Sequence, residues 1–153
     1  MTNETSFLRL YGPIELVSST TSCWNCKKAT PVHALAVSDL EDYDGESEPV
    51  RIEEPAFVYD LAEDAMPEPL VKALQELAPN YVPTYSGTLG ETTWANTCVH
   101  CQTLQGAFYM HSEPDGPFFG GPTREPALTR RQLSADGFDV DERSEEHTSE
   151  LQS

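Results

Sequence analysis

The sequence predicts an α+β domain in which a mostly antiparallel sheet carries one packed amphipathic helix. Three observations lead to this fold class. The four cysteines of the chain occur as two Cys-x-x-Cys pairs, Cys23 with Cys26 and Cys98 with Cys101. Segments rich in β-branched and aromatic residues flank both pairs, as expected of antiparallel strands joined by tight turns. Between the pairs lies one stretch with clear helical periodicity.

The two cysteine pairs together offer the ligands of one structural zinc ion. Zinc prefers four soft ligands in a tetrahedron, and two Cys-x-x-Cys pairs are a specific signal for such a site. The expected ligands are Cys23, Cys26, Cys98 and Cys101. Each pair is predicted to form a zinc knuckle at the tip of a β-hairpin, and the two knuckles to share one zinc per chain. Four thiolates leave no position open for catalysis, so the predicted role of the metal is structural.

The distance between the pairs along the chain is large. Residues 27–97, 71 in all, separate them, whereas compact zinc sites use about 15–20 residues. Closing a loop of this length costs about 4 kcal/mol of chain entropy. Zinc bound to a structural site contributes roughly 10–16 kcal/mol. The sequence therefore predicts a fold that depends on its metal.

The sequence also allows three other uses of the cysteines. Disulfides are one, and four cysteines allow three pairings, but no signal peptide indicates an oxidising compartment. A thioredoxin-like redox motif is less favoured because no βαβ pattern surrounds either pair. An iron–sulfur cluster would use the same four thiolates. His100 is expected to be exposed, and His33 and His111 to lie at the surface or beside the metal ligands rather than on the metal.

The strands and the helix are predicted from hydrophobic patterning. Strands are expected at 14–17 and 32–37 around the first pair, at 92–97 and 106–110 around the second, and centrally in the sheet at 56–61. Trp94 is expected to pack beside the second cysteine pair. The helix is expected over 67–78, with Leu70, Ala73, Leu74, Leu77 and Ala78 on its buried face. Pro79 then ends the helix.

The remaining segments are predicted to be loops or short pieces. Residues 39–54 carry eight acidic side chains against Arg51 alone, and such a density of like charge favours a solvated loop. Residues 81–90 are expected to form a second loop, and residues 113–122 a turn-rich segment in which Phe118 and Phe119 fold back on the core. A short helix is predicted near 125–134. At the N-terminus, residues 1–13 are expected to form a polar lead-in, with Phe7, Leu8 and Leu10 docked on the core.

The net charge of −17 limits the classes of partner. A chain this acidic lacks the lysines and arginines that phosphate contacts require, so neither nucleic acid nor an anionic membrane is an expected partner. No apolar run approaches the 18 residues of a membrane span. The N-terminal residues carry no basic and apolar leader, which predicts a cytoplasmic protein.

Residues 143–153 resemble a translated sequencing adapter, since reading a common adapter in frame gives these eleven residues in order. We therefore expect this segment to be foreign to the natural protein and to take no part in its fold. Residues 1–142 are expected to form a single zinc-stapled domain, a length sufficient for one hydrophobic core.

The cysteine motifs also carry a resemblance to a family. The Cys-Trp-x-Cys motif at Cys23, followed by Cys-x-His-Cys at Cys98, resembles small uncharacterised bacterial proteins with a split zinc ribbon. In this chain the aromatic residue after the second motif, Phe108, comes one residue late. The likeness covers residues 23–35 and 98–119. It implies a fold and a metal but no activity.

The sequence contains no recognisable catalytic motif, including the G-x-S-x-G nucleophile elbow and the zinc-deaminase signature. The favoured prediction is a non-catalytic interaction protein with a structural zinc ion, whose partner and oligomeric state do not follow from the residues. One alternative is an acidic immunity or inhibitor protein that binds a basic partner such as a nuclease through residues 39–54. A second alternative is an enzyme whose site the sequence does not reveal, which would require a deep polar pocket away from the metal.

Overall fold

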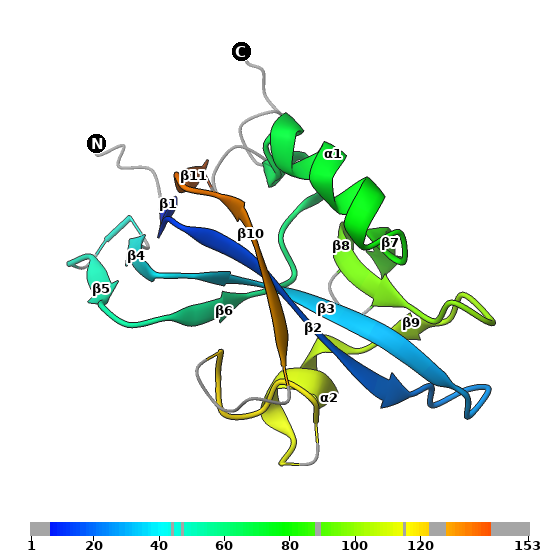
Figure 1. The fold of residues 1–153 in the computed structure, drawn as a ribbon. Helices are drawn as coiled ribbons and strands as arrows, with labels where there is room; N and C mark the ends of the chain where they lie inside the picture. Colours follow the sequence, from blue (N-terminus) through cyan, green and yellow to red (C-terminus); the bar gives the residue numbers. More distant parts are fainter. Residues whose placement is uncertain are drawn as a thin grey trace.

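The computed structural model describes residues 7–43, 45–46, 48–87, 90–114, 116–122 and 128–141, and Figure 1 gives their arrangement. The strands of this part of the chain are β1 (Phe7–Tyr11), β2 (Ile14–Ser22), β3 (Ala29–Val37), β4 (Asp39–Tyr43), β5 (Val50–Ile52), β6 (Ala56–Val58), β7 (Tyr81–Ser86), β8 (Glu91–Thr97), β9 (Leu104–Gln105), β10 (Thr129–Ser134) and β11 (Phe138–Asp141). The helices are the 3-10 helix η1 (Glu63–Ala65) and the α-helices α1 (Glu68–Leu77) and α2 (Ala107–Ser112). The expectation of a mostly antiparallel fold with few helices is confirmed.

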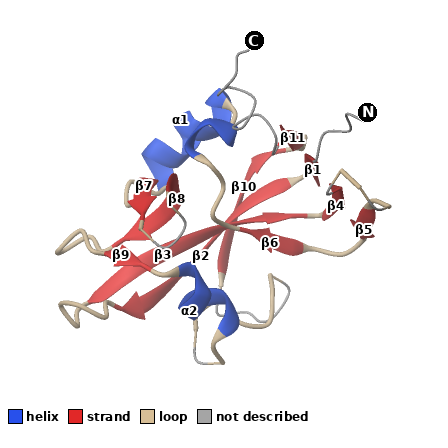
Figure 2. Cartoon of the chain, turned by 180° about the vertical axis from the view of Figure 1, so that it is seen from behind, coloured by secondary structure: helices blue, strands red, loops and turns tan. Residues whose placement is uncertain are grey.

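The strands form three sheets, where the sequence predicted one. Their orders are β11-β1-β4-β5, β10-β2-β3-β6 and β7-β8-β9, and every pairing between neighbours is antiparallel. The long β2–β3 hairpin crosses the molecule, and its turn lies beside the turn between β8 and β9 in both views (Figures 1 and 2). The second and third sheets therefore bring together the two segments that carry the cysteines.

Strand β3 is buried on both faces, which explains its near-continuous apolar sequence. Leu35 and Val37 contribute to the larger hydrophobic cluster, together with helix α1. Val32 and Ala34, on the alternate face, contribute to a smaller cluster that includes Met110 of α2 and the loop residue Phe118. Successive side chains of a strand point to opposite faces, so one strand supplies two cores.

Helix α1 falls within the range 67–78 expected from the sequence. It begins after Pro67 and carries a proline in its first turn, where the missing N–H costs no hydrogen bond. Leu70 and Leu74 are buried in the larger cluster, and Leu77 lies against that cluster partly buried. The backbone N–H of Ala78 closes the helix by donating to the carbonyl of Leu74.

The acidic segment 39–54 is not the solvated loop that its composition predicted. It contains β4 and β5, which extend the sheet beside β1. In register, Asp139, Arg9, Glu41 and Arg51 follow one another across four strands with alternating charge. Arg9 forms ion pairs with Asp139 and Glu41, and Arg51 with Asp39. Cross-strand pairs of opposite charge thus offset the repulsion that the sequence suggested.

Three further expectations are wrong for topological reasons. Residues 81–90 were expected to form a loop, but Tyr81–Ser86 forms β7 because β8 supplies an antiparallel partner along its whole length. Residues 125–134 were expected to include a helix, but Thr129–Ser134 forms β10 along β2, while 125–127 lie outside the described residues. The segment 56–61 was expected to be central in the sheet, but only Ala56–Val58 is a strand and it lies at an edge.

The return strand after the second cysteine pair is also shorter than expected. Strand β9 covers only Leu104–Gln105, and the expected strand at 106–110 is instead the start of α2. Gly106 precedes this helix, and Met110 on it is buried against Phe118 in the smaller cluster. Of the two aromatic residues in 113–122, Phe118 folds onto the core as expected, whereas Phe119 is exposed.

A buried polar seam joins β3 to β8. The Asn96 side chain accepts a hydrogen bond from the His33 backbone N–H and donates one to its carbonyl, each at 2.8 Å. The Asn80 amide donates to the carbonyls of Pro31 and Thr97, each at 2.8 Å. Its oxygen then faces the His33 ring, so Nε2 carries the proton and donates at 3.2 Å. His33 Nδ1 accepts from the hydroxyl of Ser18, which completes the seam.

Replacing Asn80 with alanine should strongly destabilise the domain. The substitution leaves the Pro31 and Thr97 carbonyls and the His33 ring without their buried partner, a cost of about 3 kcal/mol in the free energy of unfolding. Urea unfolding of the metal-loaded protein measures it. Gln75→Ala, on the exposed face of α1, should stay within about 0.5 kcal/mol of the parent. Equal stability of the two variants would contradict a stabilising role for the seam.

Candidate metal centre

The first cysteine pair lies in the turn that joins β2 to β3. The backbone N–H of Cys23 donates to the carbonyl of Lys28, and the N–H of Lys27 donates to the carbonyl of Cys23, both at 2.9 Å. Lys27 has a positive φ of 70°, the left-handed conformation that lets the chain reverse tightly. The turn therefore directs the thiols of Cys23 and Cys26 to the same side.

The turn between β8 and β9 repeats this geometry. Cys98 N–H donates to the carbonyl of Thr103 at 3.0 Å, and Gln102 N–H donates to the carbonyl of Cys98 at 2.9 Å. Gln102 has a φ of 62°, at the position equivalent to Lys27. Both pairs thus lie in hairpin turns, as the sequence predicted, and the two turns share one backbone arrangement.

The four sulfur atoms meet between the two turns. The Sγ atoms of Cys23 and Cys101 are 3.7 Å apart, and so are those of Cys26 and Cys98. All four Sγ atoms lie within 4.8 Å of one another, and the group could hold a metal ion. A tetrahedron with metal–sulfur bonds of 2.3 Å has edges of about 3.8 Å. Disulfides would require about 2.05 Å between sulfurs, and all four cysteines are free.

Backbone N–H groups of both turns point at the sulfur atoms. Those of Asn25 and Cys26 donate to Cys23 Sγ at 3.3 and 3.4 Å. In the second turn, the N–H of His100 donates to Cys98 Sγ at 3.3 Å. Donors of this kind stabilise thiolates and spread the negative charge of a four-thiolate site.

Side chains complete the shell around the sulfurs. The Gln105 amide donates to Cys23 Sγ at 3.3 Å, and the Asn25 amide donates to Cys101 Sγ at 3.6 Å. The Thr103 hydroxyl lies 3.1 Å from Cys101 Sγ and can donate to it when the sulfur is a thiolate. Asn25 and Gln105 each come from the hairpin opposite the sulfur they contact, so they help to fix the two hairpins together.

These contacts divide the thiols by acidity. Hydrogen bonds from the side chain and backbone of Thr103 lower the pKa of Cys101 to about 6. Burial opposes ionisation of Cys23, but hydrogen bonds from Cys26, Asn25 and Gln105 outweigh it and lower its pKa. A backbone hydrogen bond from Lys28 favours ionisation of Cys26, yet burial and the neighbouring thiols raise its pKa to about 11. A bound metal must therefore displace a proton from Cys26 at neutral pH.

Beyond the seam, three further contacts beside the sulfur cluster connect the two hairpins. The indole N–H of Trp24 donates to the carbonyl of Leu104 at 2.9 Å. His100 Nε2 donates to the carbonyl of Ala29 at 2.9 Å. The backbone N–H of Val99 donates to the buried hydroxyl of Thr30 at 3.1 Å. In each of these bonds a residue of one turn donates to an acceptor of the other hairpin, so each turn lies against the opposite hairpin.

Two aromatic residues differ from their expected places. Trp94, predicted to pack beside the second cysteine pair, lies in the larger core against Tyr81 and donates to the carbonyl of Glu63. Trp24 instead bonds to the opposite hairpin while its side chain stays 61% exposed. The Cys-Trp-x-Cys motif places Trp24 in the first turn, but no sequence pattern predicted that its indole N–H would donate to the carbonyl of Leu104.

The three histidines in the described part of the chain are not members of the sulfur cluster. His100 is exposed, as expected. His33 was expected at the surface or beside the metal ligands, but it is 7% exposed and belongs to the seam, where burial lowers its pKa. His111 is half-buried and stacks on Tyr59 with ring centroids 4.1 Å apart. Burial lowers the pKa of His111 to about 4, so its ring is uncharged at neutral pH.

Comparison with protein-family models, with curated proteins and with solved structures finds no match. The resemblance to split zinc ribbons therefore stays a prediction that rests on the motifs themselves. Within the described ranges, no helix is both long enough and apolar enough to cross a membrane.

Replacing Gln105 with leucine should weaken metal binding without removing a ligand. The variant loses the N–H that points at Cys23 Sγ, and loss of such a contact typically costs 10–100-fold in metal affinity. Competition with a chromophoric chelator measures the affinity. Gln132→Leu, on the exposed side of β10, makes the same chemical change away from the cysteines and should leave the affinity unchanged. The prediction fails if both variants hold the metal equally.

Proposed function

We propose that Cys23, Cys26, Cys98 and Cys101 bind one structural zinc ion in a protein whose role is non-catalytic interaction. The supporting observation is the 3.7 Å separation of two sulfur pairs, close to the edge of a tetrahedral zinc–thiolate site. In this proposal each turn is a zinc knuckle, and α1 packs on the sheets of a single domain over residues 1–142. Four thiolates fill the coordination shell, so the metal has no position for a substrate.

The close spacing of the sulfurs favours one ion over a cluster. In an iron–sulfur cluster the protein thiolates bind different irons, with the inorganic core between them. Sulfur atoms that all lie within 4.8 Å of one another leave room for a single metal ion. Zinc is the ion that tetrahedral four-thiolate sites of folded domains hold most characteristically.

The proposed role of zinc is to join two hairpins from distant parts of the chain. One hairpin belongs to the second sheet and the other to the third, with residues 27–97 between the pairs. Among the described residues, β3 and β8 meet through side chains of the seam and not through a backbone ladder. The metal would add four bonds at the far end of the same contact.

Elemental analysis of the purified chain without residues 143–153 should find about one zinc per chain. Removal of the metal by a strong chelator should unfold the domain, because zinc binding supplies much of its folding free energy. Circular dichroism before and after chelation records the loss, and added zinc should restore the signal. A Cys98→Ser variant serves as a matched comparison that lacks one ligand. A chain that contains no zinc and keeps its dichroism under chelation would overturn the proposal.

A basic protein is the partner that the charge of the chain favours. Four exposed carboxylates lie on or beside β4 and β5 and form no salt bridge within the described residues; they are Asp42, Glu48, Glu53 and Glu54. Arg9 and Arg51 neutralise other acids of this sheet. The four free carboxylates are the part of segment 39–54 that an immunity or inhibitor protein would present to a cationic surface.

Neutralising these four carboxylates should abolish capture of a basic partner. Wild-type protein and the variant Asp42→Asn, Glu48→Gln, Glu53→Gln, Glu54→Gln would each be immobilised and exposed to extract of the source cell. A basic protein should bind the wild type at low salt, elute at high salt and fail to bind the variant, because screening weakens surface charge pairs. Matched circular dichroism checks the fold. A bound protein that ignores both salt and the substitutions would contradict this role.

The enzyme alternative has one pair of side chains in its favour, Ser18 and His33. Ser18 donates to His33, and Asn80 fixes the other side of the ring, an order of groups that nucleophilic catalysis uses. The His33 ring, however, is enclosed between strands, and its two nitrogens are occupied in the seam. We assign these three residues to stability, and the non-catalytic role stays the proposal.

A further inference from the structure

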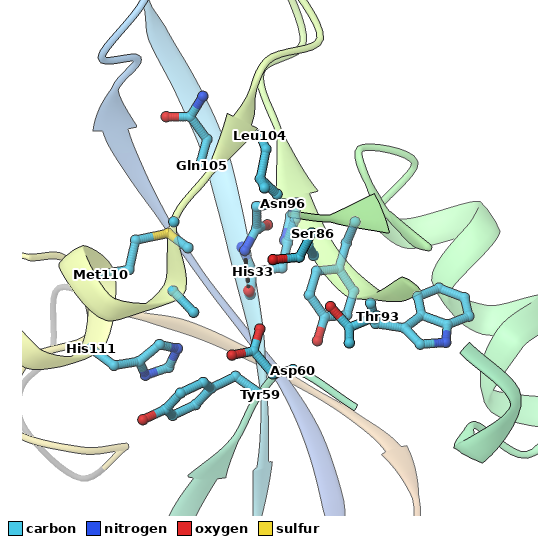
Figure 3. Close-up of a pocket in the computed structure, with 15 residues that line it drawn as sticks. His33, Tyr59, Asp60, Ser86, Thr93, Asn96, Leu104, Gln105, Met110 and His111 are labelled. Atoms are coloured by element: carbon cyan, nitrogen blue, oxygen red, sulfur yellow. Dashed lines mark hydrogen bonds between the residues drawn. The ribbon is translucent and has the colours of Figure 1, made fainter. Parts of the chain in front are cut away.

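A cavity of about 300 Å³ lies where β6 separates from β3. The pairing of Leu35 with Val58, continued by two residues, would set His33 opposite Asp60. Instead Asp60 adopts a φ of 60° and the chain turns away. The Asn96 side chain then takes the backbone hydrogen bonds of His33. Figure 3 shows the resulting space, with α2 on one side and β8 on the other.

Several polar groups of the cavity wall are already satisfied. His33 and Asn96 use their hydrogen-bonding atoms in the seam. The Gln105 amide donates to Cys23 Sγ and to the carbonyl of Thr103. These side chains shape the cavity but have little capacity left for a ligand.

Asp60 is the unpaired charge of the cavity. Its carboxylate points into the space between His111 and Thr93 (Figure 3). It forms no salt bridge or hydrogen bond with any other described residue. Asp60 as a whole is an exposed residue, but partial burial of its carboxyl group raises its pKa, and the nearby charge of Glu91 raises it further. A cation placed here would stabilise the charged carboxylate against both its partial burial and its repulsion by Glu91.

Tyr81 adds an unpartnered polar atom. The residue lines the cavity and is 3% exposed, and its hydroxyl is buried without a hydrogen-bond partner among the described residues. Burial, followed by the charge of Asp60, raises the pKa of Tyr81, so the group remains a neutral phenol. An orphan hydroxyl costs free energy that a ligand able to bond with it would recover.

Aromatic rings provide the rest of a binding wall. Tyr59, Tyr81 and Trp94 line the cavity, and Tyr59 is held by its stack with the uncharged ring of His111. Aromatic faces attract organic cations and accept their alkyl portions. Among the described residues, no lysine or arginine lines the cavity. Carboxylate and aromatic faces together disfavour an anionic ligand and favour a basic one.

We propose that the cavity bounded by Asp60, Tyr81 and His111 binds the basic group of an organic cation, an alkyl guanidinium or ammonium. Its N–H groups bond to the Asp60 carboxylate and to the Tyr81 oxygen, and its alkyl chain lies against the aromatic wall. The same chemistry belongs to a free amine and to a lysine or arginine side chain of another protein. The site does not require the zinc or the partner proposed above.

Calorimetry on the full, metal-loaded chain at low ionic strength tests the site with two probes of nearly equal shape. Butylguanidinium carries the charge, and butylurea is its neutral counterpart. The cation should bind at one site with at least about ten-fold higher affinity, since charge-assisted hydrogen bonds are the stronger ones. Backbone amide shifts in NMR spectra should change at residues 59–61 and 93–96. Equal affinity of the two probes, or shifts confined to other segments, would overturn the proposal.

Variants assign the binding to its residues. Asp60→Asn keeps the shape and tolerates the positive φ, and should weaken butylguanidinium at least about ten-fold. Tyr81→Phe should weaken it by a smaller factor, about 2- to 10-fold, because one neutral hydrogen bond is lost. Asp136→Asn removes an exposed carboxylate outside the cavity and should change nothing. If Asp60→Asn is folded by circular dichroism and binds as the wild type does, the site is wrong.

Two further probes separate the sources of the cation. Agmatine represents a free amine, and the capped peptide acetyl-Gly-Arg-Gly-amide represents an arginine of a partner protein. Tighter binding of agmatine assigns the site to a small metabolite, and tighter binding of the peptide assigns it to a protein partner. Failure of both to exceed butylurea rejects a cation site, whatever the metal content of the chain.

Discussion

The approach of β3 to β8 is the constraint on which the rest of the structure depends. No ladder of backbone hydrogen bonds joins these described strands, so side chains make the connection. Proceeding toward the cysteines, Asn96 bonds to His33, Asn80 to Pro31, Val99 to Thr30, and His100 to Ala29. These contacts keep one antiparallel register, in which the cysteines before β3 and those after β8 come to the same end of the molecule. The four sulfurs meet at the end of this series, within 4.8 Å of one another.

Two kinds of group connect the β2–β3 hairpin with the β8–β9 hairpin: the buried amides of the seam and the sulfur cluster. A buried amide is favourable only when all of its partners are in place, so the seam resists partial or shifted pairing. The sulfurs differ from the amides, because thiols without a metal gain little free energy from lying close together. Two pairs of them are 3.7 Å apart. The seam selects the register of the two hairpins, and a metal ion at the sulfurs would hold it. We expect the seam and the metal to hold the two hairpins together jointly. The seam covers only a short stretch, and the long loop between the cysteine pairs makes closure by the metal alone costly in entropy.

The features that could be predicted from the sequence are those set by residues close together in the chain. The Cys-x-x-Cys pairs and the periodicity of Leu70 and Leu74 each follow from a few neighbouring residues, and both gave the correct local structure. The errors came from partners distant in sequence. Segment 39–54 contains strands whose charges are offset by a distant residue, since Arg9, thirty residues before the segment begins, pairs with Glu41 of β4 and with Asp139 of β11. No sequence pattern predicted a binding role for Asp60. That role depends on the end of β6 just before it and on Tyr81, which belongs to another sheet.

The sulfur cluster and the cavity share a wall, and this joins the two proposals physically without making one depend on the other. Strand β9 is only two residues long, yet Leu104 accepts the Trp24 indole N–H and Gln105 donates to Cys23 Sγ. The same two residues line the cavity, and α2, which carries His111, begins directly after them. So short a strand has little stability of its own and takes its position from the cysteine hairpins. A metal at the sulfurs would therefore hold one side of the cavity in place, while Asp60 and Tyr81 on the opposite elements supply the groups that recognise a ligand.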